Sequence, residues 1–257
     1  MLGAIAGDII GSVYEHRPVK TTDFPLFQPH SRFTDDTVLT IAVAHHILSG
    51  DPLRETFHDY FARYPGAGYG SAFARWASRR DPLPYNSWGN GAAMRVSPVG
   101  FAGSTLERVL DLARKTAAVT HNHPEGIRGA QSAAAAVFLA RTGKDKDQIR
   151  DFIQDHFQYP LEAPLTLLRE RHTFDVSCQG TVPPAITAFL ESSSFEDAVR
   201  NAVSLGGDSD TLACIAGAIA HAYYGKIPPP IAGEALSRLD PPLRDTVLRF
   251  TDRYGCS

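Results

Sequence analysis

Two acidic clusters, far apart in the chain, hold the residue types best suited to chemistry. They are Phe-Thr-Asp-Asp-Thr at residues 33–37 and Gly-Gly-Asp-Ser-Asp-Thr at residues 206–211. Each precedes an apolar run and is predicted to form the N-terminus of a buried helix. If the fold brings the two N-termini together, four carboxylates converge, and unpaired buried carboxylates cost several kcal/mol each. Divalent cations would supply the counter-charge, and oxygen ligands from Asp and Thr suit Mg²⁺ or Mn²⁺ rather than zinc.

Helix capping is the alternative explanation of these clusters. Asp, Ser and Thr are preferred N-caps, and acidic residues in a first turn interact favourably with the helix dipole. Capping would account for either cluster alone. Both clusters contain a pair of aspartates and a following threonine. Because one carboxylate satisfies a cap, the repeated pattern favours a metal site.

A segment without helical periodicity, residues 15–33, lies directly before the first cluster. Long irregular loops in compact domains are often lids over sites, and we predict that this one is a mobile lid. Glu15 stands at its start, where it could reach the metals as a ligand or act as a base for water. The alternative for Glu15 is a solvated surface side chain.

Two further loops carry candidate binding residues. In segment 86–100, Gly89 and Gly91 would let backbone N–H groups approach a phosphate, and Trp88 could stack on a base; a plain turn and plain packing are the alternatives. In segment 120–126, His121 and His123 lack further ligands at zinc spacing. We predict that His121 donates a hydrogen bond to a phosphate or ribose and that His123 is structural.

Composition limits the class of protein. The chain has 257 residues, 43% hydrophobic residues and a net charge of -3, as expected of an ordinary soluble globular protein. It shows neither a membrane-spanning apolar run nor the basic start of a signal peptide, so we expect a cytoplasmic monomer without membrane or stable nucleic-acid partners. Three cysteines without CxxC spacing argue against a disulfide scaffold and a zinc knuckle.

Helical periodicity recurs along the chain, and alternating strand patterns are scarce. Gly3, Gly7 and Gly11 would share one face of a first helix and let another helix approach closely. Proline and glycine mark the joins, Pro183-Pro184 among them. The prediction is a single all-α domain over residues 1–257 with long connecting loops. Besides the first helix and the runs 38–48 and 212–224, helices are predicted at 52–64, 70–80, 103–118, 125–141, 145–157, 180–191, 195–204 and 232–254.

Five motifs in order resemble those of the ADP-ribosylglycohydrolase family. They are Gly-Asp-x-x-Gly-Ser-x-x-Glu at 7–15, Phe-Thr-Asp-Asp-Thr at 33–37, Gly-Asn-Gly-x-Ala-Met-Arg at 89–95, Thr-His-x-His-Pro at 120–124 and Gly-Gly-Asp-Ser-Asp-Thr at 206–211. The resemblance implies an all-α fold that holds two Mg²⁺ ions, with Mn²⁺ as a substitute. It also implies hydrolysis of the bond between C1″ of ADP-ribose and a modified acceptor.

The resemblance assigns roles to individual positions. Glu15 resembles the glutamate of the flexible loop, and Glu15 or Asp35 would serve as the base for the attacking water. Ser87 and the turn Gly89-Asn90-Gly91 fall where the family meets the pyrophosphate and distal ribose, Trp88 where an aromatic lies near adenine, and His121 where a histidine contacts the ligand. Asp8 would be a helix-end or supporting residue. The implied metal ligands are Thr34, Asp35, Asp36, Asp208, Asp210 and Thr211.

Other classes of protein fit less well. Terpenoid synthases also bind Mg²⁺ through Asp-rich helix ends, but their pattern needs an acidic residue where Leu39 stands. A haloacid-dehalogenase-type phosphatase would place its aspartates after a strand near the N-terminus. A non-catalytic ADP-ribose or nucleotide-binding module remains the alternative outside enzymology. The acceptor is open: arginine, serine, nucleic-acid ends and small conjugates all fit the motifs.

Overall fold

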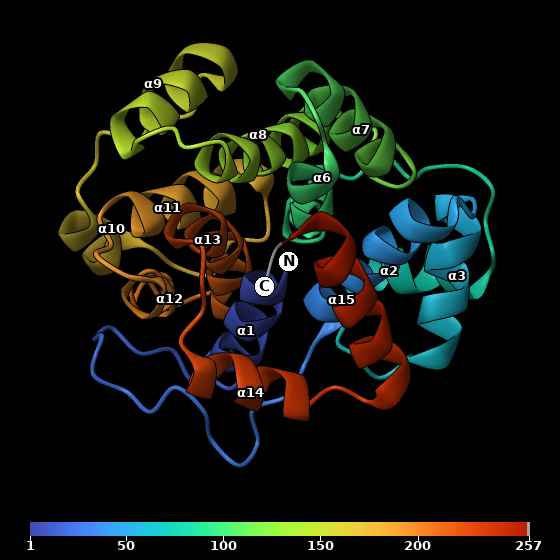
Figure 1. Cartoon of the computed structure of the whole chain (residues 1–257), viewed down its shortest axis with the longest axis horizontal. Helices are drawn as coiled ribbons and strands as arrows, with labels where there is room; N and C mark the ends of the chain where they lie inside the picture. Colours follow the sequence, from blue (N-terminus) through green and yellow to red (C-terminus); the bar gives the residue numbers. More distant parts are fainter. Residues whose placement is uncertain (256–257) are drawn as a thin grey trace.

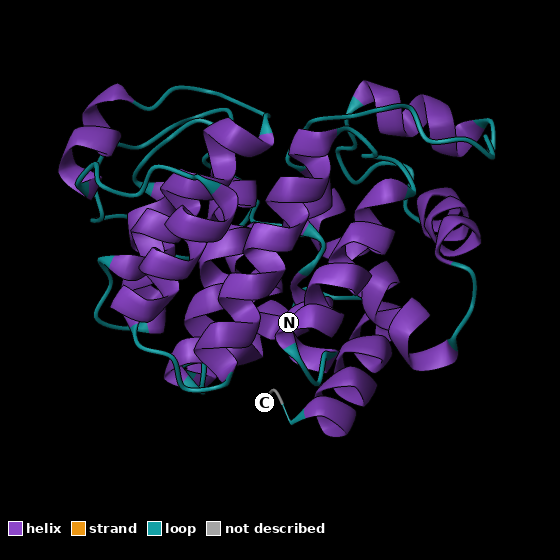
Figure 2. Ribbon diagram, turned by 90° about the horizontal axis from the view of Figure 1, so that it is seen from above, coloured by secondary structure: helices purple, strands orange, loops and turns teal. Residues whose placement is uncertain are grey.

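The computed structural model describes residues 1–255, and over that range the chain is all-α, as predicted (Figure 1). Figure 2 shows helices joined by loops, several of which run along the upper edge of that view. Within these residues the only pairing of β type is an isolated bridge between Gly89 and Ser177. Cys178 and Cys214 are free and buried, and Cys256 lies outside the described residues. No helix in the described part of the chain has the length and apolar character needed to cross a membrane.

The helices of residues 1–255 have the following bounds: α1 Leu2–Gly11, α2 Asp35–Ser49, α3 Leu53–Arg63, α4 Ser71–Ser78, α5 Gly91–Met94, α6 Ser97–Ala102, α7 Leu106–Ala118, α8 Pro124–Arg141, α9 Lys146–Phe157, α10 Leu165–Arg171, α11 Cys178–Leu190, α12 Phe195–Val203, α13 Ser209–Tyr224, α14 Pro229–Ser237 and α15 Pro241–Tyr254.

Helix α1 lies at the centre of the fold and packs closely along α13 (Figure 1). A Cβ atom on Gly3 would lie 2.3 Å from the carbonyl oxygen of Gly217, and one on Gly7 would lie 2.0 Å from that of Ala213. A Cβ on Gly11 would lie 2.5 Å from Cα of Asp210. The predicted glycine face is therefore confirmed. It brings the C-terminal end of α1 against the start of α13, where the second acidic cluster stands.

Helix α2 begins at the first acidic cluster and is buried from Asp36 to Ala44. Thr34 is its N-cap and accepts a hydrogen bond from the backbone N–H of Asp36 at 3.3 Å. Gly50 ends the helix in the left-handed conformation at φ 81°, which glycine adopts without steric cost. Because α2 also packs on α1, the N-termini of α2 and α13 are held near the same end of α1.

Prolines produce two departures from the predicted helices. The predicted helix 232–254 is two helices, α14 and α15, because Asp240 caps α15 and Pro241-Pro242 occupy its first turn, where no N–H is needed. Pro183-Pro184 lie inside α11 and not at a join. The short helices α5, α6 and α10 were not predicted, since so few residues give little periodicity.

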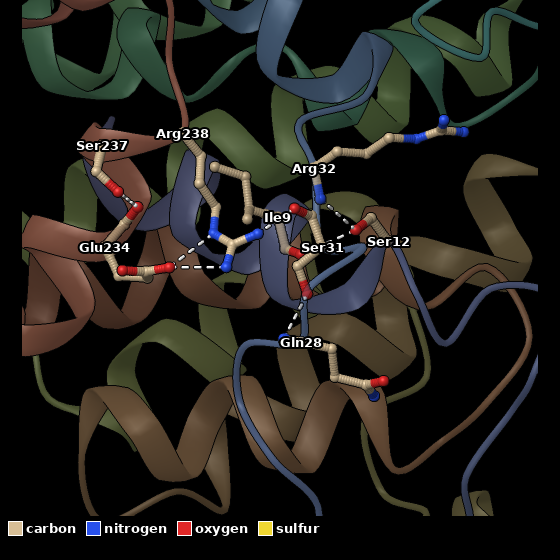
Figure 3. Close-up of polar contacts among 8 residues, drawn as sticks. All are labelled: Ile9, Ser12, Gln28, Ser31, Arg32, Glu234, Ser237 and Arg238. Carbon is tan, nitrogen blue, oxygen red and sulfur yellow. Dashed lines mark hydrogen bonds and ion pairs between the residues drawn. The ribbon is translucent and has the colours of Figure 1, made fainter.

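The loop between α1 and α2 contains no helix, as predicted, and its last part is fastened to α14 and α1 (Figure 3). Arg238 donates a hydrogen bond to the carbonyl of Ser31 and is itself paired with Glu234 at 2.7 Å. The backbone N–H of Arg32 donates to Ser12 Oγ at 3.2 Å. In Figure 3 the Arg32 guanidinium extends away from this network.

The middle of the same loop is held against α12 and the turn that follows it. Arg200 donates to the carbonyls of Thr22 at 3.0 Å and Phe24 at 2.7 Å. Lys20 Nζ donates to the carbonyl of Leu205 at 2.5 Å, close to the second acidic cluster. These anchors hold the middle and the last part of the loop, and Val19 packs against the core. The mobility of the predicted lid stays a prediction.

Candidate active site

A cavity of about 530 Å³ opens at the end of the fold where α2 and α13 begin. One side, which we call the acidic wall, consists of Glu15, Thr34, Asp35, Asp36, Asp208, Asp210 and Thr211. The other side, which we call the donor wall, consists of Ser87, Gly89, Asn90, Gly91 and His121. Of the site residues predicted from the sequence, the cavity brings together all except Trp88.

The two acidic clusters meet in the acidic wall although 175 positions separate Asp36 from Thr211. The Thr211 hydroxyl donates to Asp36 Oδ2 at 3.3 Å. Carboxylate oxygens of Glu15, Asp208 and Asp210 lie within 4.8 Å of one another. Capping accounts for Thr34, but the side chain of Asp208, at the N-cap position of α13, makes no capping hydrogen bond. Capping alone therefore does not explain the second cluster.

Asp8 on α1 forms hydrogen bonds with the first acidic cluster. Its carboxylate accepts hydrogen bonds from the backbone N–H and hydroxyl of Thr34 at 2.9 and 2.7 Å, and from those of Thr37 at 3.1 and 2.5 Å. Burial raises the pKa of Asp8 to about 6, and these hydrogen bonds act in the opposite direction. Asp8 therefore ties the start of α2 to α1. Its oxygens also come within 4.8 Å of those of Asp36 and Asp210.

Burial and mutual repulsion disfavour ionisation of aspartates of the acidic wall. Burial raises the pKa of Asp36 and of Asp210 well above the ordinary value, and neighbouring carboxylates add to both shifts. Burial, then the charges of Asp8 and Asp208, raises the pKa of Asp35 to about 8. Among residues 1–255, Asp36 Oδ1 is buried without a hydrogen-bond partner. Ionised together, these groups would repel one another, so the cluster is suited to cations.

The donor set fits a hard divalent metal ion. It is made entirely of carboxylate and hydroxyl oxygens, the ligands that such ions prefer. The Thr34 hydroxyl gives its proton to Asp8 and the Thr211 hydroxyl gives its proton to Asp36, so both oxygens keep lone pairs for a cation. The unpartnered Oδ1 of Asp36 is a further available ligand atom.

Glu15 stands at the edge of the acidic wall, at the start of the loop. Burial raises its pKa; the neighbouring His16 opposes this shift and Asp208 adds to it. The charge of Arg32, whose side chain lines the same part of the cavity, also lowers the pKa of Glu15. The sequence analysis did not identify Arg32, because nothing in its local pattern distinguishes it from a surface arginine.

The donor wall is joined to the acidic wall through Asn90. Its side-chain amide donates to Asp208 Oδ2 at 2.6 Å and to Thr181 Oγ1 at 3.0 Å. Ser87 Oγ accepts from the backbone N–H of Gly89 at 3.2 Å, which shapes the predicted turn. The turn then enters α5, whose first residue is Gly91. Backbone and amide groups of this wall are therefore held in position by hydrogen bonds, one of which goes to Asp208 of the acidic wall.

The two predicted histidines have different surroundings. His121 is buried and lines the cavity. His123 caps α8, and its Nδ1 accepts from the backbone N–H of Glu125 at 3.1 Å, so it has a structural contact as predicted. Burial, together with the charge of Arg95, lowers the pKa of His121 well below the ordinary value. His121 is therefore neutral.

Arg95 ends the motif at 89–95, but the sequence assigned no role to it. It is the largest fully buried side chain of the described residues. Its guanidinium lies 4.4 Å from the ring centroid of Phe57 and donates to Thr120 Oγ1 at 2.7 Å. Its Nε and Nη1 have no hydrogen-bond partner within residues 1–255. An arginine within an otherwise apolar helical stretch was the signal that could have identified it.

The aromatic residues that line the cavity do not include the predicted Trp88. Trp88 is 49% exposed and does not line the cavity, whereas Phe174 is 57% exposed and does. Tyr85 and Phe73 also contribute to the lining. The backbone of Trp88 nevertheless holds this region together, because its carbonyl accepts from the N–H of Cys178 at 3.1 Å.

The chain is similar in sequence and in fold to known proteins. A family model described as ADP-ribosylglycohydrolase matches residues 1–254. The chain is 28% identical to the ADP-ribosylhydrolase ARH3 of Bos taurus, over 88% of this chain and 84% of that protein. It is 24% identical to the ADP-ribosylarginine hydrolase Tri1 of Pseudomonas putida (strain GB-1), over 88% of this chain and 69% of that protein. A solved structure described as an ADP-ribosylglycohydrolase-related protein complex superimposes with a TM-score of 0.71 at 27% identity, covering 98% of this chain and 96% of that chain.

Proposed function

This chain belongs to the ADP-ribosylglycohydrolase family, and on that premise we propose that it removes ADP-ribose from a modified acceptor by water attack at C1″ of the distal ribose. We propose further that two Mg²⁺ ions, held by Thr34, Asp35, Asp36, Asp208, Asp210 and Thr211, are required. The observation that carries the proposal is the meeting of buried, mutually repelling carboxylates from α2 and α13 in a cavity that the donor wall also lines.

The acidic wall would orient the ribose and activate water. When bound, divalent ions supply counter-charge, polarise oxygen ligands and lower the pKa of water. Glu15 accepts a proton from the attacking water, and its raised pKa makes it a stronger base than a solvated glutamate. Asp35, which lines the same wall, is the second candidate for this role. The water oxygen forms a bond to C1″, the bond between C1″ and the acceptor breaks, and the acceptor leaves with the bonding electrons.

The donor wall would bind the rest of ADP-ribose. Ser87 and the backbone of the turn from Gly89 to Gly91, which line the cavity, would contact the pyrophosphate, and His121 would donate to a ligand oxygen. Adenine would lie at the mouth of the cavity, beside the exposed Phe174 and close to Trp88. Holding the ligand at both ends fixes C1″ against the acidic wall, which contributes to catalysis through orientation.

The acceptor is the least determined part of the proposal. The name of the Pseudomonas putida relative specifies ADP-ribosylarginine, whereas the name of the Bos taurus relative specifies no acceptor. Arginine, serine, nucleic-acid ends and small conjugates are the candidates for this chain. Release of ADP-ribose from a panel of defined conjugates, measured at equal concentrations, would identify the preferred class.

The test of the proposal is turnover of a labelled ADP-ribosylated protein with Mg²⁺ and with EDTA. We expect release of ADP-ribose that EDTA abolishes and added Mg²⁺ restores. A non-catalytic ADP-ribose-binding module is the alternative. It would bind ADP-ribose but release none from any conjugate of the panel, with or without metal, and that result would refute the proposal.

A further inference from the structure

The two ring nitrogens of His121 have unlike surroundings. Nδ1 lies 2.7 Å from Thr120 Oγ1, on the protein side of the ring. Nε2 faces the donor wall: a Cβ atom on Gly91 would lie 3.1 Å from it, and one on Gly89 would lie 3.9 Å from it. The absence of a side chain at Gly91 therefore keeps the Nε2 edge of the ring open.

The hydrogen bonds of the Thr120 hydroxyl indicate which nitrogen of His121 carries the proton. Thr120 is completely buried, and its hydroxyl has one proton to donate and two lone pairs. Arg95 Nη2 fills one lone pair and, as a guanidinium, can only donate. The Tyr85 hydroxyl is close enough to Thr120 to interact with it. If Arg95 and Tyr85 both donate to Thr120, its own proton goes to Nδ1 of His121.

A second arrangement would also satisfy these groups. His121 Nδ1–H would donate to Thr120, and the Thr120 proton would go to Tyr85. The buried charge of Arg95 disfavours this second arrangement. Arg95 lies on the Nδ1 side of the ring, where a positive charge favours a lone pair facing it and disfavours an N–H dipole pointing at it. Electrostatic interactions of this kind are strong in a buried site.

We propose that Arg95 and Thr120 are positioning residues that hold His121 as the neutral tautomer protonated on Nε2, so that it always presents one hydrogen-bond donor to the cavity. The oxygen that accepts this bond belongs to ADP-ribose, and that part of the inference rests on the proposed function. The tautomer itself does not depend on it. Burial together with the charge of Arg95, which lowers the pKa of His121, also keeps the ring neutral.

The direct test is the ¹⁵N NMR spectrum of the histidine rings in the ligand-free protein. Ring shifts distinguish a protonated from an unprotonated nitrogen, and we expect the proton of His121 on Nε2. In Thr120→Val the Nδ1 partner is lost and both tautomers should become populated, whereas Thr120→Ser should restore the wild-type spectrum. Thr116→Val is the matched control, because it removes another buried hydroxyl, which within residues 1–255 donates to the Ala113 carbonyl of its own helix. It keeps the Thr116 backbone carbonyl, which accepts from Arg95 Nη2 at 3.3 Å.

Titration with ADP-ribose tests the consequence for binding. We expect affinity to fall about five- to tenfold in Thr120→Val, the size of one hydrogen bond, and to stay unchanged in Thr120→Ser and Thr116→Val. Gly91→Ala, whose Cβ would press on Nε2, should weaken binding by a similar factor while leaving the tautomer as in the wild type.

The outcomes separate this inference from the proposed function. A proton on Nδ1 in the wild-type protein would overturn the inference whatever the activity, and this measurement needs no variant to fold. Wild-type tautomer and affinity in a folded Thr120→Val would overturn it as well. The predicted tautomer in a protein that neither binds nor releases ADP-ribose would instead leave the arrangement of Arg95, Thr120 and His121 standing and refute the proposed function.

Discussion

The two walls of the cavity differ in how far their polar groups find partners within the protein. In the acidic wall, carboxylates crowd together, their pKa values are raised, and Asp36 Oδ1 has no partner within residues 1–255. In the donor wall, neutral groups are held by hydrogen bonds, such as those from Asn90 to Asp208 and Thr181. Under the proposed function, the acidic wall needs cations to offset its repulsion, whereas the groups of the donor wall are already held in position by hydrogen bonds within the protein.

This contrast predicts that the two walls respond differently to change. Substitutions in the acidic wall should affect activity greatly and could even increase the stability of the metal-free protein, since they relieve repulsion. Substitutions in or beside the donor wall should act mainly on affinity for ADP-ribose.

Asp210→Asn should cause the largest loss. The amide keeps the size of the side chain but removes the charge that a metal ligand supplies, so hydrolysis should fall on the order of 10³-fold or more. The melting temperature in EDTA should stay equal or rise, because burial and like charges raise the pKa of Asp210 in the wild type. Asp245→Asn, on the exposed face of α15, is the control and should change neither quantity. Full activity of Asp210→Asn would exclude a ligand role for this residue.

Glu15→Gln should lower kcat on the order of 10²- to 10³-fold while ADP-ribose affinity changes little, since it removes the base but keeps the size of the side chain. Steady-state kinetics and ADP-ribose titration on the same preparation separate the two effects. Glu170→Gln, exposed on α10, is the control. Near-full kcat in Glu15→Gln would assign the base to Asp35 and leave Glu15 as a residue of the loop surface.

Without metal, the stability of the protein should fall as pH rises. This is the opposite of the usual effect of aspartates, which stabilise a fold as they ionise. Unfolded aspartates titrate near a pKa of about 3.9, whereas burial and repulsion raise the pKa of Asp35 to about 8 in the fold. The folded state therefore binds more protons in this window, and metal-free stability is lost as pH rises from about 4 to about 8. Divalent ions remove the repulsion.

Melting temperatures measured in EDTA and in Mg²⁺ across that window test this prediction. The gain produced by Mg²⁺ should grow with pH, and it should be smaller and less steep in Asp210→Asn. A gain that is the same at every pH would show that the carboxylates of the acidic wall are not the groups that bind the ion.

Substitutions of aromatic residues at the mouth of the cavity should have the smallest effects, and these should be on ADP-ribose binding. Phe174→Ala removes a stacking surface that lines the cavity and should weaken ADP-ribose binding about tenfold. Trp88→Ala should weaken it less, because Trp88 does not contribute to the lining. Fluorescence titration with ADP-ribose and with ribose 5-phosphate, which lacks the base, distinguishes stacking from other losses. A larger loss in Trp88→Ala than in Phe174→Ala would restore the assignment of adenine to Trp88.

The sequence predicted the parts of the site that have local signals. Asp35 and Asp210 stand in capping patterns before apolar runs, and Gly3, Gly7 and Gly11 predicted the close helix pair that brings those patterns together. The sequence could not predict contacts between segments that only the fold brings together. The four hydrogen bonds of Asp8 and the burial of Arg95 against Phe57 join segments whose proximity no periodicity encodes.

A crystal structure with Mn²⁺, located by its anomalous scattering, tests the central claim most directly. We expect two ions in the acidic wall, about 3.5–4 Å apart, with ligands from both α2 and α13. Asp210→Asn crystals prepared in the same way should lose at least one ion. A single ion, or ions bound by residues of only one of the two helices, would contradict the account.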